Sequence, residues 1–274
     1  MTEVGLVDWG IGGLSVYKEL MSRIPVSCVY LSDSGFTPYG KLTQKKLISR
    51  LNDVAQFFRK KKIFYVIIAC NAASTVLEEV QSLNPDMEFY GMLLAGAKAI
   101  QSHRKKNVLV LGGRRTIRSG FFQTYFAPLT LHVDALVAQS LSAIIERGEH
   151  QNPLFIKTLH KITKPLNESP ELVLLACTHY PAAYETFARY FPHSKIVDPA
   201  TFLIDDLQKR WKRLKPSNIA SPTKKTKPTS KRILNRFYTT GNPHTSRDAA
   251  FKAFGIRIKK FHPLSLTLST KSKI

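Results

Sequence analysis

Two cysteines stand at matching places in two similar segments of the sequence. The segments "VIIACNAAS" (66–74) and "VLLACTHYP" (173–181) each carry a buried-strand pattern, an alanine, a cysteine and then a small polar residue. A single cysteine after an apolar run is usually a small core hydrophobe, because free cysteine is among the most buried residue types. Two cysteines in equivalent positions, Cys70 and Cys177, instead favour a shared chemical role.

The chemistry open to two opposed thiols is proton transfer at a carbon atom. The carboxyl ends of strands in an open parallel sheet line the ligand crevice. Two halves packed face to face would therefore bring Cys70 and Cys177 to opposite sides of one cleft. One thiolate removes a proton while the opposite thiol delivers another to the other face, which inverts a stereocentre without a cofactor. The sequence thus predicts a two-base site.

Composition limits the alternatives. A chain of 274 residues with 43% hydrophobic content can bury two cores of ordinary size, so we expect two domains. The odd count of three cysteines, without clustered spacing, argues against a disulfide framework or a Cys-rich zinc site. Cys28, inside an apolar strand pattern, is expected in the core. No export signal and no apolar run of membrane-spanning length is visible, so we expect reduced thiols, no membrane contact and a cytoplasmic location.

The elements that must position the thiols are strands alternating with helices. Helical spacing of apolar residues covers 13–23 and 43–61, and such alternation is typical of βαβ units with parallel sheets. We therefore predict an α/β protein made of two similar α/β domains, whose parallel-rich sheets face each other across a central cleft. The expected strands are 4–7, 28–31, 64–69 and 89–93 in the first half, and 108–111, 131–137, 172–176 and 195–197 in the second.

The chain is strongly basic, with 41 Lys and Arg against 19 acidic residues and a formal net charge of +22. Two runs, "KRWKRLK" (209–215) and "TKKTKPTSKR" (223–232), supply much of the excess, and the second is typical of a solvated loop or linker. A basic stripe of this kind can bind nucleic acid non-specifically. A merely solvated basic face is the favoured interpretation, because charge runs are weak motifs.

With both cysteine segments in view, the sequence resembles the glutamate racemase family, within the aspartate/glutamate racemases, over nearly the whole chain. Each motif alone is weak, but together and in the family's order they are specific. The resemblance implies two facing α/β domains, with 1–95 and 208–274 forming the first and 96–207 the second. The motifs are "GLVDWGIGGLSV" (5–16), "DSGFTPYG" (33–40), "ACNAAS" (69–74), "TIRSGFF" (116–122), "ACTHYP" (176–181), "VDPA" (197–200) and "FYTTGNP" (237–243).

The resemblance also implies roles for the residues that carry it. Cys70 and Cys177 match the family's acid/base thiols, the first acting on the D-enantiomer and the second on the L-enantiomer. Asp8 is expected on the Cys70 side, His179 beside Cys177, and Glu146 in support of that histidine. Such groups modulate thiol ionisation or contact a substrate ammonium. Taken singly, they have structural alternatives: a strand-end cap, a core histidine and a surface helix charge.

Substrate binding is expected from backbone and small polar groups, since backbone N–H groups near helix starts suit carboxylates. No metal, NAD, flavin or pyridoxal cofactor is implied. The matching substrate-contacting positions are Pro38, Tyr39, Gly40, Asn71, Thr116 and Thr178.

Three departures from the family's pattern fall in the expected pocket. Trp9 stands where the family usually has serine, Ala72 where it has threonine, and Phe36 where it has arginine. Each hydrogen bond lost to a charged ligand would weaken binding by roughly 1.5–3 kcal/mol. We expect the indole of Trp9 to point into the cleft, where the matching serine faces substrate, and count Trp9 and Ala72 among the substrate-contacting positions.

The resemblance implies a cofactor-independent amino-acid racemase that interconverts L- and D-glutamate for peptidoglycan precursor synthesis. One alternative is a racemase of another acidic or related amino acid with an altered pocket. A second is a weakly active member whose basic surface binds nucleic acid or gyrase. The sequence leaves a homodimer open.

Overall fold

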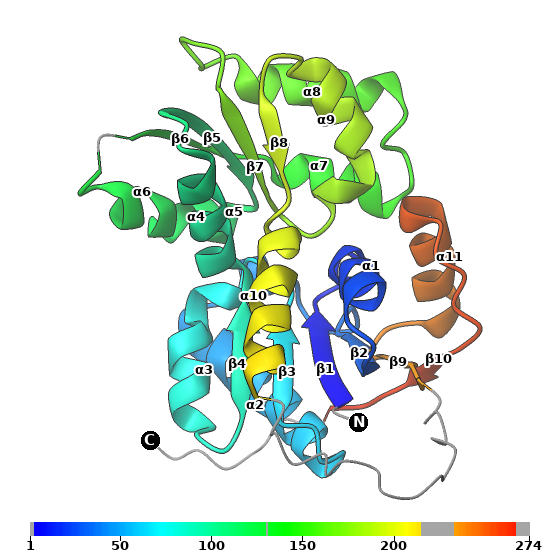
Figure 1. Cartoon of the computed structure of the whole chain (residues 1–274). Helices are drawn as coiled ribbons and strands as arrows, with labels where there is room; N and C mark the ends of the chain where they lie inside the picture. Colours follow the sequence, from blue (N-terminus) through cyan, green and yellow to red (C-terminus); the bar gives the residue numbers. More distant parts are fainter. Residues whose placement is uncertain (1–2, 130, 215–232, 267–274) are drawn as a thin grey trace, which may run out of the picture.

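The structure, a computed structural model, describes residues 3–129, 131–214 and 233–266 (Figure 1). Two sheets organise these residues, and the strand pairings in both are parallel. This arrangement confirms the prediction of an α/β protein with two parallel sheets. The six-stranded sheet has the order β10-β9-β2-β1-β3-β4, and the four-stranded sheet has the order β6-β5-β7-β8. The strands are β1 Glu3–Asp8, β2 Ser27–Ser32, β3 Tyr65–Ile68, β4 Glu88–Gly91, β5 Asn107–Gly112, β6 His132–Val137, β7 Leu172–Ala176, β8 Lys195–Val197, β9 Arg236–Thr239 and β10 Phe261–Pro263.

Helices connect the strands, as parallel pairing requires. Within the described residues, α2 (Gln44–Lys60) shows why the helices form. Thr43 caps its start by accepting the Lys46 N–H, and its apolar side chains recur at helical spacing on the buried face. The others are α1 Leu14–Arg23, η1 Tyr39–Lys41, η2 Ala73–Val76, α3 Leu77–Leu83, α4 Met92–His103, α5 Arg114–Arg118, α6 Phe121–Phe126, α7 Gln139–Glu146, α8 Pro153–Thr163, η3 Tyr180–Ala183, α9 Tyr184–Tyr190, α10 Pro199–Leu214 and α11 Pro243–Phe254.

The predicted strand at 89–93 is wrong at its carboxyl end. Strand β4 stops at Gly91, whose backbone is extended, and helix α4 begins at Met92. The hydroxyl of Ser74 accepts the Met92 N–H at 3.0 Å and so satisfies a free donor at the start of the helix. A short apolar run cannot be assigned to a buried strand or a buried helix by periodicity alone.

Two strands of the six-stranded sheet come from the end of the chain and were not predicted. Strand β9 pairs with β2, with Arg236 opposite Val29, and β10 pairs with β9. Both are short, four and three residues, so they carry little periodic pattern. Residues 233–266 thereby join the sheet formed by the first 91 residues. The domain boundaries themselves, at 95/96 and 207/208, stay a prediction.

One apolar cluster runs through both sheets. It joins Leu6 of β1, Leu111 of β5, Leu175 of β7 and Ile204 of α10, all buried. Helix α10 lies beside α4 and contacts α1, so it spans the junction between the sheets (Figure 1). Cys28 is fully buried in this cluster, which confirms its expected place in the core.

Among the described stretches of chain, no helix combines the length and the apolar character needed to cross a membrane.

Candidate active site at the facing strand ends

The carboxyl ends of β1 and β7 meet at a buried carboxylate. Asp8 is the last residue of β1 and is only 1% exposed. Its Oδ2 accepts hydrogen bonds from the Gly13 N–H at 2.7 Å and from the Thr178 hydroxyl, two residues beyond β7, at 3.2 Å. Burial raises the pKa of Asp8, and the nearby charge of His179 opposes that rise. The two sheets are thus linked at the point where the sequence predicts the site.

The glycine-rich turn after β1 lets the backbone approach the β7 side closely. A Cβ added to Gly12 would lie 2.5 Å from the Thr178 hydroxyl and 2.6 Å from Nδ1 of His179. Atoms do not approach so closely, so only glycine fits this position without displacing those side chains. Ser15, at the start of α1, donates a hydrogen bond to the Thr178 carbonyl at 3.1 Å and reinforces the contact.

Cys177, His179 and Glu146 form a chain of contacts on the second sheet's side. Nδ1 of His179 lies 3.8 Å from Sγ of Cys177, and its Nε2 is hydrogen-bonded to the Glu146 carboxylate. Burial alone would lower the pKa of His179, but hydrogen bonds to Cys177 and Glu146 and their negative charge raise it well above the ordinary value. A protonated imidazole in this position can donate a hydrogen bond to a Cys177 thiolate. The three residues named from the resemblance therefore lie together.

Ser142 also contacts Cys177 and was not among the predicted site residues. The thiol of Cys177 lies 3.8 Å from the Ser142 hydroxyl and can donate to it. Ser142 donates its own proton to the Gln139 carbonyl at 3.1 Å, so its lone pairs are available to the thiol. A sequence signal for it existed, because Ser142 and Glu146 are four residues apart in α7 and must share one helix face.

Cys70 lies in the turn between β3 and η2. Burial, followed by the charge of Asp8 and of Cys177, raises the pKa of the Cys70 thiol well above its ordinary value. Hydrogen bonds from the backbone N–H groups of Ala72 and Ala73 oppose the rise. Burial and the charges of Asp8 and Cys177 therefore favour the thiol form of Cys70.

Asn71 and Thr116, both expected to contact substrate, are buried polar residues. The Asn71 side chain is 3% exposed, and neither its Oδ1 nor its Nδ2 has a hydrogen-bond partner among the described residues. Buried amides are normally paired. An unpaired one beside Cys70 indicates a place where a polar ligand can bind. Thr116 is 1% exposed, in α5 after β5.

The loop carrying Pro38, Tyr39 and Gly40 is held by Asp33. The Tyr39 hydroxyl donates to Asp33 at 2.8 Å, and Arg50 donates to both oxygens of the same carboxylate, at 2.8 and 2.6 Å. Because the Tyr39 hydroxyl donates its proton to Asp33, the loop can offer a substrate carboxylate its backbone N–H groups but not this hydroxyl as a donor. A Cβ on Gly40 would lie 3.8 Å from Oε1 of Gln139 in α7, so the loop approaches the second sheet's side.

Two of the departures from the family's pattern contact each other. The indole N–H of Trp9 donates to the carbonyl of Phe36 at 2.9 Å. The Phe36 ring lies 4.2 Å from the Arg50 guanidinium carbon, and both aromatic side chains are partly buried against the cluster that also contacts Cys70. Trp9 is therefore tied to the 33–40 loop. The expectation that its indole also narrows the cleft stays a prediction.

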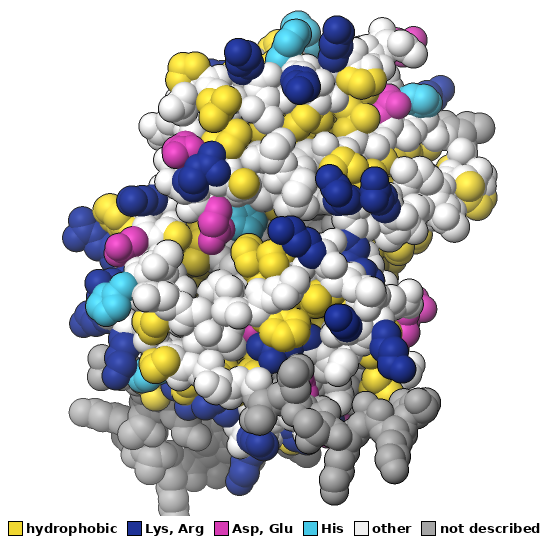
Figure 2. Space-filling view, turned by 180° about the vertical axis from the view of Figure 1, so that it is seen from behind, with side chains coloured by type: hydrophobic (Ala, Val, Ile, Leu, Met, Phe, Trp, Pro, Cys, Tyr) yellow, Lys and Arg dark blue, Asp and Glu magenta, His cyan; other side chains and the backbone are white. Residues whose placement is uncertain are grey.

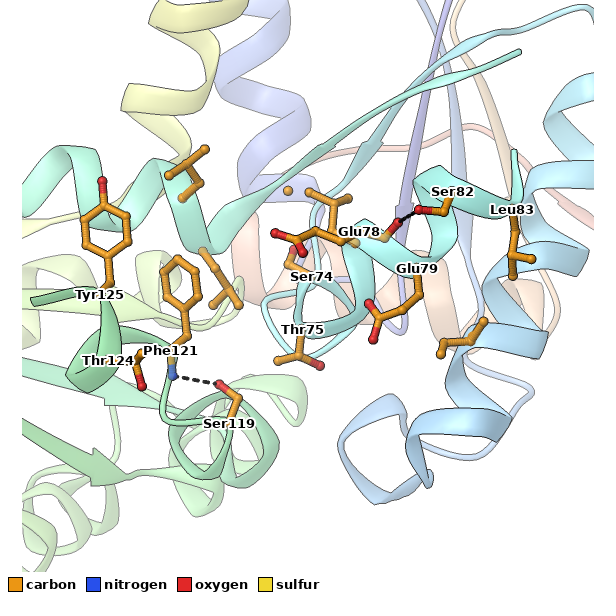
Figure 3. Close-up of a pocket in the computed structure, with 15 residues that line it drawn as sticks. Ser74, Thr75, Glu78, Glu79, Ser82, Leu83, Ser119, Phe121, Thr124 and Tyr125 are labelled. Atoms are coloured by element: carbon orange, nitrogen blue, oxygen red, sulfur yellow. Dashed lines mark hydrogen bonds between the residues drawn. The ribbon is translucent and has the colours of Figure 1, made fainter. Parts of the chain in front are cut away.

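A surface groove of about 1120 Å³ lies beside the Cys70 turn and contains neither thiol of the pair. Side chains of η2 and α3, including Thr75 and Glu78, face side chains from α5 to α6, including Phe121 and Tyr125 (Figure 3). Ser74 and Thr75 belong to both the groove wall and the segment after Cys70. The groove is thus a neighbour of the candidate site and not the site itself.

The predicted basic stripe falls largely outside the described residues, which omit 215–232. Of its first part, Lys209 and Arg210 are exposed at the end of α10, and the Arg210 guanidinium carbon lies 5.5 Å from the Tyr90 ring centroid. On the face shown in Figure 2, Lys and Arg side chains are spread over both halves of the molecule and not gathered in one patch. Binding of nucleic acid or gyrase stays a prediction.

The ionisable side chains Asp8, Glu146 and His179 are each hydrogen-bonded to a neighbouring group of the site. His179 is bonded to Glu146, and Asp8 to the Gly13 N–H and Thr178. Within the part of the chain that the structure describes, no group of three or more His, Cys, Asp or Glu side chains is placed to hold a metal ion. The pairings suit proton transfer, in which each thiol needs a group that tunes its ionisation.

Two parallel sheets, with Cys177 directly after β7 and Cys70 two residues after β3, define the class of the protein as α/β. The model of one family, Asp/Glu/Hydantoin racemase, matches residues 25–207, more than half of the chain. The chain therefore belongs to the Asp/Glu/Hydantoin racemase family, a family of isomerases. This finding confirms the resemblance that the motifs carry.

The relatives match most of the chain. A glutamate racemase of Streptococcus suis (strain 05ZYH33) is 28% identical over 264 residues, which cover 94% of this chain and 97% of the relative. A glutamate racemase of Staphylococcus aureus (strain JH9) is 31% identical over 200 residues, which cover 71% and 75%. The crystal structure of glutamate racemase from Francisella tularensis in complex with D-glutamate has a TM-score of 0.83 at 23% identity and covers 97% of this chain and 98% of that one. This last likeness shows a shared fold.

Proposed function

We propose that this chain is a cofactor-independent glutamate racemase that interconverts L- and D-glutamate by proton transfer between Cys70 and Cys177. The observation that carries the proposal is the asymmetric setting of the two thiols. Cys177 faces an imidazole that Glu146 helps to keep protonated, whereas burial and Asp8 keep Cys70 protonated. The names of the relatives support glutamate as the substrate.

In the L-to-D direction, the Cys177 thiolate removes the proton from Cα. The His179 N–H at 3.8 Å stabilises that thiolate before the transfer. The Cys70 thiol then gives its proton to the opposite face of the carbanion, leaving Cys177 as thiol and Cys70 as thiolate. In the D-to-L direction the same two transfers run in reverse, so each complete cycle balances.

Substrate polar groups would be met by side chains and backbone around the thiols. The unpaired amide of Asn71 and the hydroxyl of Thr178 suit the α-carboxylate, and the backbone of the 38–40 loop suits the side-chain carboxylate. Asp8, between the two sheets, suits the ammonium group, whose positive charge would favour the ionised carboxylate.

A second candidate is a racemase of another acidic or related amino acid. It is favoured by one observation: Trp9 and Phe36, which replace polar residues of the family's pattern, are joined by a hydrogen bond and packed against the cluster around Cys70. Ala72 likewise offers no hydroxyl. A smaller or less polar side chain would fit such a pocket better than glutamate.

The wider role follows from the substrate. D-glutamate made by this reaction would supply peptidoglycan precursor synthesis, in the cytoplasm. A homodimer, and a partner for the basic surface, are further predictions that leave the chemistry unchanged.

The experiment that tests the proposal is exchange of the Cα proton in deuterated water, measured for a panel of L- and D-amino acids. We expect deuterium in both enantiomers of glutamate, together with loss of optical rotation. Exchange confined to another amino acid would establish the second candidate. No exchange with any member of the panel would refute racemase activity.

A further inference from the structure

Arg115, which was not among the predicted site residues, connects the two halves of the site through its side chain. It is the second residue of α5, which follows strand β5 of the four-stranded sheet. Its Nε donates a hydrogen bond to the hydroxyl of Thr75 at 2.8 Å, and its Nη1 donates to the carbonyl of Leu42 at 2.8 Å. Both acceptors belong to the other half of the chain.

The two acceptors lie in the two segments that the proposed reaction depends on. Thr75 is in η2, five residues after Cys70, and its hydroxyl donates onward to the Ala72 carbonyl at 2.7 Å. The chain of bonds from Arg115 through Thr75 therefore reaches the turn that holds the Cys70 thiol. Leu42 directly follows η1, and its N–H is bonded to the carbonyl of Tyr39 in the loop expected to contact substrate.

The guanidinium suits this position because its donors are held in one rigid plane. A planar fork can bond two acceptors at once, whereas an ammonium group is a point charge on a flexible stem. The Arg115 side chain is partly buried, and burial lowers its pKa, while the negative charge of Glu79 and of a Cys70 thiolate opposes that shift. The positive charge of Arg115 therefore also interacts favourably with a Cys70 thiolate.

We propose that Arg115 is a positioning residue, which fastens the Cys70 turn and the 38–42 loop to the opposite half and so sets the spacing between the two thiols. The catalytic part of this inference rests on the proposed racemase function. Its structural part, the ordering of two segments by one side chain, can be measured without turnover.

Removal of the charge has a consequence that a purely structural role would lack. Cys70 interacts electrostatically with these charged and titratable groups: Asp8, Tyr30, Tyr39, Cys177 and Arg115. Arg115 is the cation in this set, so its loss makes the Cys70 thiolate less favourable. The limb of the pH profile that depends on ionised Cys70, seen in kcat/KM for the D-enantiomer, should then move to higher pH.

The test compares Arg115→Gln and Arg115→Lys with Arg114→Gln as the matched control. Arg114 is the exposed neighbour in the same helix. We expect kcat/KM in both directions to fall by about 10- to 100-fold in Arg115→Gln, because a misplacement of the reacting groups by about 1 Å lowers the rate by up to about 100-fold. Arg115→Lys should keep the position of the pH limb but not the full rate, and Arg114→Gln should resemble the parent protein.

Amide hydrogen exchange on the full chain supplies the readout without turnover. Exchange should quicken at 38–42 and at 70–76 in Arg115→Gln and stay unchanged in Arg114→Gln. Thr75→Val, a milder change, should loosen the 70–76 segment alone and add little in combination with Arg115→Gln. Arg115→Gln kinetics that match those of Arg114→Gln would overturn the inference, as would unchanged exchange in both segments. The two proposals can fail separately. If the parent protein does not racemise glutamate, but amide exchange at 38–42 and 70–76 still quickens in Arg115→Gln, the proposed function is refuted and the ordering role of Arg115 stands.

Discussion

Glu146 at the end of α7 and His179 beyond β7 form an ion pair next to Cys177, in which the imidazole is buried and the carboxylate is partly exposed. The pair is the physical source of the asymmetry between the two thiols, because it favours a protonated imidazole 3.8 Å from Cys177, whereas burial and the charge of Asp8 raise the pKa of Cys70.

Replacement of Glu146 should therefore weaken the Cys177 half-reaction first. In Glu146→Gln, the pKa of His179 falls, since one of the groups that raise it is gone. We expect kcat for L-glutamate to drop by about 10- to 100-fold, within the range of acid/base contributions. Glu149→Gln, which removes an exposed carboxylate paired with Arg147, is the control and should leave kcat unchanged.

The same pair predicts a pH dependence of stability. The folded-state pKa of His179 is raised, so the folded protein binds this proton more tightly than the unfolded chain. The contribution is fully present below about pH 6.5, the ordinary pKa of histidine, and is lost as the pH rises through the raised folded value. The difference in Tm between the parent protein and Glu146→Gln should thus be largest near pH 6 and shrink at higher pH. A difference that grows with pH would contradict this sign.

Both thiols should be indispensable. Cys70→Ala and Cys177→Ala should each lower racemisation in both directions by at least about 100-fold, because a two-base inversion needs an acceptor and a donor on opposite faces. Cys28→Ala, at a buried core cysteine, should lower the Tm while keeping turnover. Near-normal turnover by either of the first two variants would end the two-thiol hypothesis.

The Asp8 carboxylate should lower the stability of the fold while being required for racemisation. Its folded pKa is raised by burial, so the free energy of unfolding falls as the pH rises from the ordinary aspartate pKa of about 4 through that raised value. Asp8→Asn keeps the shape and removes the buried charge. At pH 7–8 we expect a Tm higher by ~2–4 °C, the shift that about 1 kcal/mol gives in a chain of this size, together with loss of racemisation.

Asp33→Asn is the contrasting variant for this test. The Asp33 carboxylate is buried but paired with Arg50, so neutralising it leaves an uncompensated cation and should lower the Tm. A Tm that falls in Asp8→Asn as well would mean that the Asp8 carboxylate stabilises the fold.

Trp9→Ser tests what the pocket accepts. If the indole narrows the cleft, the smaller hydroxyl-bearing side chain should raise kcat/KM for glutamate by ~10-fold, equivalent to about 1.4 kcal/mol. The Tm should fall at the same time, because the indole is partly buried and bonded to Phe36. Trp9→Phe keeps the bulk and loses only the N–H, so it should give no gain in kcat/KM. Unchanged glutamate kinetics in Trp9→Ser would assign the indole a packing role alone.

Much of the fold and the thiol pair could be predicted because they depend on local pattern. Apolar runs mark the strands, and the residue after a strand end, such as Cys177, is placed by the strand itself. Arg115 was missed because its hydrogen bond to Thr75 joins segments 40 residues apart. Ser142 was missed because its spacing from Glu146 indicates a shared helix face but not the contact with Cys177, 35 residues away. No local pattern reports such distances, since they are set by how the two sheets pack.

The short strands β9 and β10 were missed for a related reason. A strand of three or four residues has too few side chains to show alternation, and its identity comes from the partner it pairs with, here β2 at more than 200 residues' separation. The helix start at Met92 was misjudged because the Ser74 hydroxyl that satisfies it comes from a different element.

The apolar cluster shared by both sheets also bears on how the molecule comes apart. Each sheet also has an apolar cluster of its own, but Leu6 of one sheet and Leu175 of the other are buried in one continuous cluster that the two sheets share. Unfolding of either sheet would expose apolar side chains of the other sheet to water. Heat should therefore unfold the described halves in a single cooperative transition, with calorimetric and van't Hoff enthalpies that agree. Wide separation of the sheets would expose the same shared apolar cluster to water. We therefore expect substrate to enter through movement of loops at the edge of the cleft and not through opening of the core.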